Sequence, residues 1–235
     1  MANCVLVHGA WHGGWCWKKV SPLLRQQGHE VFTPTLTGSG ERSHLLTREV
    51  NLSTFVQDIV AALKYEDLND VILVGHSFAG MVITGVADRV PDKLARLVYL
   101  DSTMPSAGRS FMDVNTATLG RTVQQAVDSD GDGWRLPPFS LSSMGVTDAE
   151  DLEWMESKMC DHPLAAATEP LQFDSLVIQA IPRTYIRCTD GSPWLADTAA
   201  RLKSDKAWQF IEIESGHDAM VTVPQKLADM LMNLA

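Results

Sequence analysis

One stretch of this chain constrains its fold more than any other: an apolar run that leads directly into a serine with small neighbours. Residues 71–82 read VILVGHSFAGMV. The apolar start predicts a short buried strand and the end predicts a helix, so Ser77 is expected at a sharp turn between them. A serine in such a turn is a nucleophile whose neighbours crowd the adjacent strand and helix. The crowding explains the small residues Gly75, Ala79 and Gly80, which a serine that only caps a helix would not need.

The length and charge of the chain limit its architecture and its partners. Its 235 residues are 45% hydrophobic, enough for one substantial core in a single domain. The formal net charge of −10 predicts no binding to nucleic acid or anionic membranes, because no basic patch can neutralise phosphates. No stretch approaches the length of a membrane span, and the chain opens in a strand pattern instead of a signal peptide. We therefore expect a cytoplasmic protein, monomeric or homodimeric.

Neither the cysteines nor the acidic residues predict a metal site. The four cysteines lack the spacing of metal ligands, and we expect them to be free thiols. The acidic run DSDGDG at residues 128–133 resembles the start of a calcium loop, but Phe139 stands where the bidentate glutamate belongs. We predict an acidic turn there, and no metal or other cofactor.

Strand and helix patterns alternate in the first part of the chain and again near its end. The alternation predicts a mostly parallel sheet with helices on both faces. Between them, residues 102–181 show amphipathic segments without a clear strand. We predict an α/β core from residues 1–101 and 182–235, and a small, mainly helical cap from residues 102–181. The strand patterns lie at residues 3–7, 30–33, 71–74, 94–100, 184–188 and 207–213, and the helical patterns of the core at 17–27, 52–63, 81–87 and 224–234.

A serine hydroxyl is a weak nucleophile and needs an imidazole base, which in turn needs a carboxylate to orient it. His217 is the candidate base, since it lies in a glycine-containing loop directly after the last predicted strand. Asp101 and Asp190, which follow two successive predicted strands, are the candidate acids. We favour Asp101, because a carboxylate at the end of an apolar strand needs a buried partner. Asp190 stays the alternative, although it lies two residues past Cys188 and the commoner acid position, one residue later, holds Gly191.

Acyl transfer also needs N–H donors for the negative oxygen that forms on the attacked carbonyl. The amide of Phe78, directly after the serine and at the start of a helix, is one candidate. The glycine-rich segment HGAWHGGW at residues 8–15 contains the other, which we assign to Ala10. His8 and His12 are interpreted as hydrogen-bonding residues of this loop.

Three segments together resemble the plant methylesterase and hydroxynitrile lyase branch of the α/β-hydrolases: residues 8–15, residues 71–82 and the Gly216-His217 loop. The chain looks nearer still to bacterial esterases of that branch, including those that hydrolyse small aromatic methyl esters and the methyl carbamate of benzimidazole fungicides. The resemblance covers most of the chain outside the cap. It implies an α/β-hydrolase fold with a serine nucleophile.

Lyases and esterases of this branch differ at three positions. The lyases carry threonine, glutamate and lysine where this chain has Gly9, His76 and Asp218. All three departures favour the esterase, because the chain lacks the ammonium group that would stabilise a departing cyanide. The resemblance therefore implies a serine esterase that acts on small methyl esters or methyl carbamates through an acyl-enzyme.

The expected substrate is a small-molecule ester in an apolar pocket of aryl size. We expect Trp11, Phe111, Trp134 and Trp154 to line that pocket, together with Phe78. Two alternatives remain open. One is a hydroxynitrile lyase or carbon–carbon bond hydrolase that uses the same three residues, and the other is a non-catalytic receptor for a small ligand.

Overall fold

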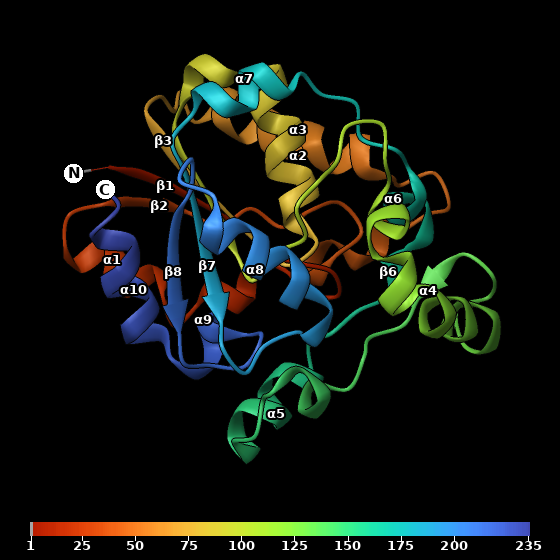
Figure 1. Ribbon diagram of the computed structural model, residues 1–235. Coiled ribbons are helices and arrows are strands. Elements are labelled where there is room, and N and C mark those ends of the chain that lie inside the picture. Colours follow the sequence, from red (N-terminus) through yellow and green to blue (C-terminus); the bar gives the residue numbers. More distant parts are fainter. Residues whose placement is uncertain (1) are drawn as a thin grey trace.

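The computed structural model describes residues 2–235, apart from the side chains of residues 116–119, so Met1 of the predicted core lies outside it. A six-stranded sheet forms its centre, in the order β2-β1-β3-β4-β7-β8 (Figure 1). All neighbouring strands pair in parallel, which confirms the predicted sheet. The strands are β1 (Asn3–Val7), β2 (Glu30–Phe32), β3 (Val71–His76), β4 (Leu94–Leu100), β7 (Arg183–Cys188) and β8 (Gln209–Ile213).

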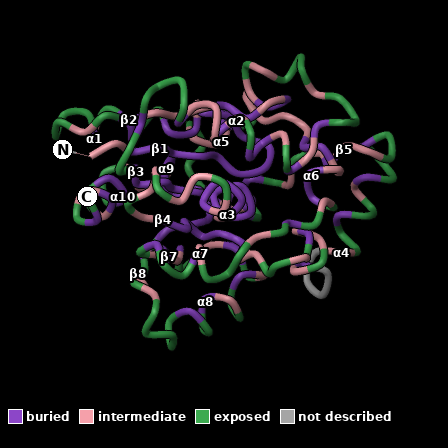
Figure 2. Tube along the Cα trace, turned by 90° about the horizontal axis from the view of Figure 1, so that it is seen from above, coloured by how far each residue is buried: buried purple, intermediate pink, exposed green. Residues whose placement is uncertain are grey.

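Helices cover both faces of the sheet, as predicted. In Figure 1, α1 (Ser21–Gln26), α9 (Ala219–Thr222) and α10 (Pro224–Met232) lie on one side. The other side carries α2 (Leu52–Tyr65), α3 (Ala79–Arg89) and α8 (Ala196–Ser204). The strand β3 is buried at every position, and Figure 2 shows it with α3 in the buried centre of the molecule.

One predicted helix is divided in two. The pattern at residues 17–27 becomes a 3₁₀-helix at Gly14–Trp17 followed by the short α1, because Pro22 stands at the start of α1 and prevents a continuous helix through this point. The other 3₁₀-helices are Gly40–Leu45, Pro91–Lys93, Leu141–Met144 and Pro193–Leu195.

Residues 102–181 hold the predicted cap, and they are mainly helical. They contain α4 (Phe111–Ser129), α5 (Ala149–Glu156), α6 (Leu164–Thr168) and α7 (Ser175–Ala180). The expectation of no strand here is wrong, because β5 (Arg135–Leu136) pairs antiparallel with β6 (His162–Pro163). Two residues are too few to show the alternation that predicts a strand. That this region is a separate unit stays a prediction.

The structure holds four free cysteines. No helix in the described part of the chain is long and apolar enough to cross a membrane. Among the same residues, no group of three or more metal-ligating side chains is arranged to hold an ion.

The small residues around Ser77 lie against backbone atoms. A Cβ added at Gly75 would lie 2.8 Å from the carbonyl oxygen of Ala79. A Cβ added at Gly80 would lie 2.2 Å from the carbonyl oxygen of Thr103. Both distances are far below contact range, so larger residues would push β3 or the end of β4 away from α3.

We predict that Gly80→Ala destabilises the protein by about 1–3 kcal/mol, because the backbone at Thr103 has to move. Gly85→Ala is the matched control on the same helix. Its Cβ would meet a methyl group of Val56 at 2.7 Å, and that side chain can rotate away. Urea unfolding of the three proteins measures the difference, and equal losses of stability in both variants would contradict the packing argument.

Candidate active site

Ser77 follows the last residue of β3 and precedes α3, in a left-handed backbone conformation with φ of +57°. This conformation is costly for a residue other than glycine and persists only where neighbours enforce it. The end of β4 and the residues after it do so. The N–H of Ser77 donates to the carbonyl of Leu100, and its own carbonyl accepts from the hydroxyl of Ser102 at 2.6 Å and the N–H of Thr103 at 3.2 Å.

The structure brings together Ser77, His217 and Asp101 in one hydrogen-bonded chain. The Nε2 atom of His217 lies 2.8 Å from the Oγ atom of Ser77, and its Nδ1 atom lies 2.7 Å from Oδ2 of Asp101. The serine follows β3, the aspartate follows β4 and the histidine follows β8, so all three lie at the carboxyl edge of the parallel sheet. This is the order of nucleophile, base and orienting carboxylate that activates a serine hydroxyl.

The carboxylate of Asp101 is buried and fully engaged. Besides His217, it accepts hydrogen bonds from the guanidinium of Arg187 and from the N–H groups of Cys188 and Ser192. Burial alone would raise the pKa of Asp101, but the hydrogen bond and charge of His217, with Arg187 and the Ser192 N–H, outweigh it and lower that pKa. Asp101 is therefore ionised, and it fixes the proton of His217 on Nδ1, which leaves Nε2 free to accept from the serine.

The alternative acid, Asp190, does not reach His217. Its side chain is exposed, and its N–H donates to the carbonyl of Ser215. The commoner acid position is filled by Gly191, where an added Cβ would be 2.4 Å from Oδ2 of Asp101. The carboxylate from β4 thus occupies the space that a side chain at the commoner acid position would need.

Two supporting residues were not predicted from the sequence. The hydroxyl of Ser192 lies 2.9 Å from Nδ1 of His217, and Arg187 pairs with Asp101. From the sequence, Ser192 indicated only the start of a helix. Arg187 could have indicated a nearby carboxylate, because a charged residue next to the end of a buried strand needs a partner of opposite charge.

The amides of Ala10 and Phe78 border the cavity at Ser77. Within the described residues, no acceptor takes either N–H. His8 orients the first of them: it accepts the N–H of Leu36 on Nε2 at 3.0 Å and so donates from Nδ1 to the carbonyl of Gly9 at 2.8 Å. That carbonyl belongs to the same peptide group as the Ala10 N–H. Burial lowers the pKa of His8 to about 3, so the ring stays neutral and holds this peptide plane in one orientation.

A buried ion pair ties the same loop to the loop of His217. The Nδ1 atom of His12 lies 2.7 Å from the carbonyl oxygen of Ala10, and its Nε2 atom lies 3.1 Å from Oδ1 of Asp218. Both partners are acceptors, so the ring needs two protons. Burial lowers the pKa of His12, but the carboxylate of Asp218 outweighs it and raises that pKa above its usual value. In turn, burial raises the pKa of Asp218, and His12 more than compensates and holds it well below its usual range.

His76, next to the serine, also supports His217. Its Nε2 atom donates to the carbonyl of His217 at 3.0 Å, and the two rings pack with centroids 4.5 Å apart. Burial, with the charge of His217, lowers the pKa of His76 to about 3, so this ring is neutral. It therefore positions the loop and is not a second base.

The cavity at Ser77 is largely apolar and aromatic. Trp11 and Phe111 line it, with Phe78, as expected. The prediction for Trp134 and Trp154 is wrong: Trp134 stacks with the guanidinium groups of two arginines, and Trp154 packs against Trp15. No sequence pattern pointed to the other lining residues, which are Val123, Leu136, Phe139, His162, Ala167 and Trp194.

Known proteins resemble the chain along almost its full length. The profile of the alpha/beta hydrolase family matches residues 4–230. The carbendazim hydrolyzing esterase of Nocardioides sp. (strain SG-4G) is 39% identical, covering 100% of both chains. Methylesterase 2 of Arabidopsis thaliana is 29% identical, covering 98% of this chain and 95% of its own. Among solved structures, an extracellular alpha/beta-hydrolase from a Paenibacillus species superposes with a TM-score of 0.86 at 26% identity, covering 99% of this chain and 98% of that one.

We predict that Asp101→Asn slows the reaction of Ser77 with a fluorophosphonate by about a thousandfold or more, because the amide cannot hold the proton of His217 on Nδ1. Asp190→Asn is the matched control and is expected to react at the wild-type rate. Labelling rates, followed by mass spectrometry on protein with an unchanged circular dichroism spectrum, separate the two. A slow Asp190→Asn variant would contradict the assignment.

The ion pair of His12 and Asp218 makes a prediction for stability. A histidine whose pKa is raised by folding stabilises the fold fully below its unfolded pKa of about 6.5, and loses that contribution as the pH rises through the folded value. We expect the free energy of unfolding to fall as the pH rises above about 6.5, with a slope of at most about 1.4 kcal/mol per pH unit from this group.

His12→Gln removes the titrating group, so the difference in free energy of unfolding between wild type and variant should become smaller as the pH rises. His44→Gln, at an exposed position, is the control and should keep the wild-type profile. Urea unfolding at several pH values measures both. If His12→Gln keeps the wild-type slope, the ring carries one proton and the ion pair does not exist.

Proposed function

The chain belongs to the alpha/beta hydrolase family, with esterases among its relatives, and we propose that it is a serine esterase that hydrolyses small methyl esters or methyl carbamates through an acyl-enzyme. The observation that carries the proposal is the chain of short hydrogen bonds from Ser77 through His217 to Asp101. An ionised, buried carboxylate at one end and a strained serine at the other are the arrangement that nucleophilic acyl transfer requires.

The first half of the reaction forms the acyl-enzyme. His217 Nε2 takes the proton of Ser77 as Oγ attacks the carbonyl carbon, and Asp101 stabilises the imidazolium. The N–H groups of Ala10 and Phe78 hold the negative oxygen of the tetrahedral intermediate. When the intermediate collapses, the bond to the methoxy group breaks and His217 gives its proton to the departing oxygen, which leaves as methanol.

The second half releases the acid. A water molecule gives a proton to His217 and attacks the acyl carbon, and a second tetrahedral intermediate forms in the same donor pair. Its collapse returns the electron pair to Ser77 Oγ, which regains its proton from His217. The products are the free acid, or a carbamic acid where the substrate was a carbamate.

The cavity beside Ser77 supports a small substrate with an aromatic or apolar acyl group. Trp11 and Phe139 pack with ring centroids 4.7 Å apart on one wall, and Phe78 and Phe111 lie 5.2 Å apart on another. The free volume of the cavity is about 20 Å³, little more than one water molecule needs, so an aromatic substrate requires the lining side chains to move apart. The 39% identical relative is named for hydrolysis of carbendazim, which places methyl carbamates among the first compounds to test.

The observed contacts argue against the two other functions considered. A lyase of this branch needs a cation after the base, and here Asp218 is an anion that faces His12. A receptor would not require the ordered contacts of Ser77, His217 and Asp101.

The proposal is tested by mapping the residue that a fluorophosphonate labels and by a substrate panel of aryl methyl esters, alkyl methyl esters, an N-aryl methyl carbamate and mandelonitrile. We expect labelling of Ser77, turnover of esters or the carbamate, and loss of both in Ser77→Ala. Folded protein that stays unlabelled, or that cleaves mandelonitrile but no ester, would overturn it.

A further inference from the structure

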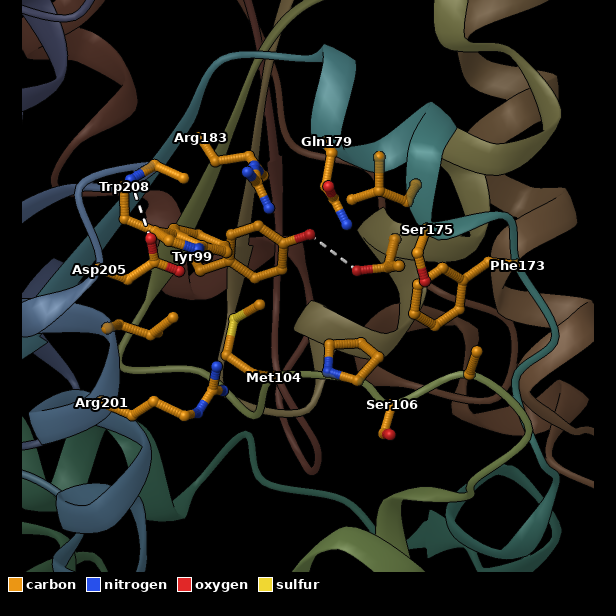
Figure 3. A pocket seen from close by; sticks show the side chains of 16 residues that line it. Tyr99, Met104, Ser106, Phe173, Ser175, Gln179, Arg183, Arg201, Asp205 and Trp208 are labelled. Atoms are coloured by element: carbon orange, nitrogen blue, oxygen red, sulfur yellow. Dashed lines mark hydrogen bonds between the residues drawn. The ribbon is translucent and has the colours of Figure 1, made fainter.

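A second cavity, of about 520 Å³, lies apart from the one at Ser77 and shares no lining residue with it. We call it the arginine cavity. Its walls come from β4, the segment after β4, α7, β7, α8 and the residues before β8. The residues that define it are Tyr99, Met104, Phe173, Arg183, Arg201 and Trp208 (Figure 3). Its volume lies within the range of ordinary small-molecule sites.

Two guanidinium groups point into this cavity from opposite sides in Figure 3, Arg183 from β7 and Arg201 from α8. Neither forms a hydrogen bond or an ion pair through its side chain with any residue that the structure describes. The Nε atom of Arg183 is buried without an acceptor, which is costly for a charged donor. By contrast, Arg42, Arg135 and Arg187 each pair with an aspartate. The cavity therefore offers unused donors to an anion.

The cavity is positive in a chain whose formal net charge is −10. Its only lining carboxylate is Asp205, against two guanidinium groups. Oδ1 of that aspartate accepts the N–H of Ala207 at 2.9 Å, and no ion pair joins it to Arg183 or Arg201. The excess positive charge selects an anion over a neutral ligand.

The lining beside the two cations includes two partly exposed aromatic side chains, Phe173 and Trp208. The guanidinium of Arg183 lies 4.6 Å from the ring of Trp208, which in turn meets Tyr99 edge to face at 5.4 Å. The hydroxyl of Tyr99 is already engaged at 2.8 Å with Thr84, whose own proton goes to the carbonyl of Gly80. Tyr99 therefore needs no further polar partner. Its side chain is fully buried and packs behind Trp208, so the aromatic surface beside the two cations comes from Trp208 and Phe173.

We propose that the arginine cavity binds a small aromatic carboxylate. The two guanidinium groups hold the carboxylate, for which their planar fork of donors is matched, and Trp208 and Phe173 take the ring. A phosphate or sulfate would satisfy the arginines but leave the aromatic wall unused. The proposal is independent of the chemistry at Ser77, because the two cavities are separate.

The experiment is a titration with benzoate, with benzamide as its neutral isostere and sulfate as its non-aromatic counterpart. Calorimetry gives the affinity, and the NMR signal of the Trp208 indole N–H, assigned with Trp208→Phe, reports on this cavity alone. Protein treated beforehand with a fluorophosphonate gives the same measurement with the Ser77 cavity blocked. We expect benzoate to bind and shift the Trp208 signal whether or not Ser77 is blocked, and benzamide and sulfate to bind about tenfold more weakly or not at all.

The variants Arg183→Gln and Arg201→Gln should each weaken benzoate about tenfold or more. Arg121→Gln, at an exposed position on α4, is the matched control and should bind as wild type does. Arg201 is exposed, so its variant keeps the test valid even if Arg183→Gln misfolds. Unchanged affinity in Arg201→Gln, no shift of the Trp208 signal, or equal binding of benzamide or sulfate would overturn the proposal. Failure of Ser77 to react with the fluorophosphonate would bear only on the proposed function.

Discussion

The left-handed turn at Ser77 is the constraint on which the rest of the site depends. Such a backbone conformation costs of the order of 1–3 kcal/mol, and the segment after β4 supplies the hydrogen bonds that maintain it. Ser102 and Thr103 hold the carbonyl of Ser77, and Asp101 stands directly before them. One short segment therefore both stabilises the backbone conformation of Ser77 and carries the carboxylate that is hydrogen-bonded to His217. The glycine at position 80 lets that segment come close enough to α3 to do so.

This arrangement explains why β7 supplies partners for the acid and not the acid itself. With the carboxylate of Asp101 filling the space beside Gly191, a second carboxylate there would meet it at close range, and the two negative charges would repel. The strand instead carries Arg187 next to its last residue, and the turn after it presents the N–H and hydroxyl of Ser192. These groups keep the buried Asp101 ionised. An acid at the end of β4 therefore depends on the arginine and the N–H donors that β7 and the following turn place around it.

Two carboxylates help to position His217, one directly and one through the loop that carries it. Asp101 accepts a hydrogen bond from the ring of His217. Asp218, the next residue in the chain, pairs with His12 and so anchors the loop that carries His217. Since His12 also donates to the carbonyl of Ala10, one charged ring connects the loop of the base with the loop that carries a candidate oxyanion donor. His8 and His76 are neutral instead. Nε2 of His8 accepts the N–H of Leu36, and Nε2 of His76 donates to the carbonyl of His217. Burial lowers the pKa of His8, which pairs with no anion among the described residues, and of His76, whose Nε2 lies 4.0 Å from Oδ1 of Asp218. At His12 the same carboxylate oxygen is nearer, at 3.1 Å, and its attraction outweighs the effect of burial.

The sequence predicts those parts of the fold and the site that local pattern controls. Strand and helix periodicity predicted the parallel sheet. The small residues around Ser77 and the loop position of His217 pointed to the two side chains that the structure joins by a hydrogen bond. The sequence did not decide between Asp101 and Asp190 as the acid, because the choice depends on how deeply each carboxylate is buried against a neighbouring strand. Arg187, which pairs with Asp101, could have pointed to the right one.

The cap shows where local pattern stops being informative. Trp134 and Phe139 lie five residues apart outside any long helix, and only tertiary packing turns the first toward arginines and the second toward Trp11. His162 reaches the cavity through a two-residue strand that has no periodicity to detect. Side chains that enter the site from segments without a repeating pattern are fixed by contacts that form only after the core has folded. The pocket wall, and with it the choice of substrate, is therefore the part of this protein that its sequence encodes least directly.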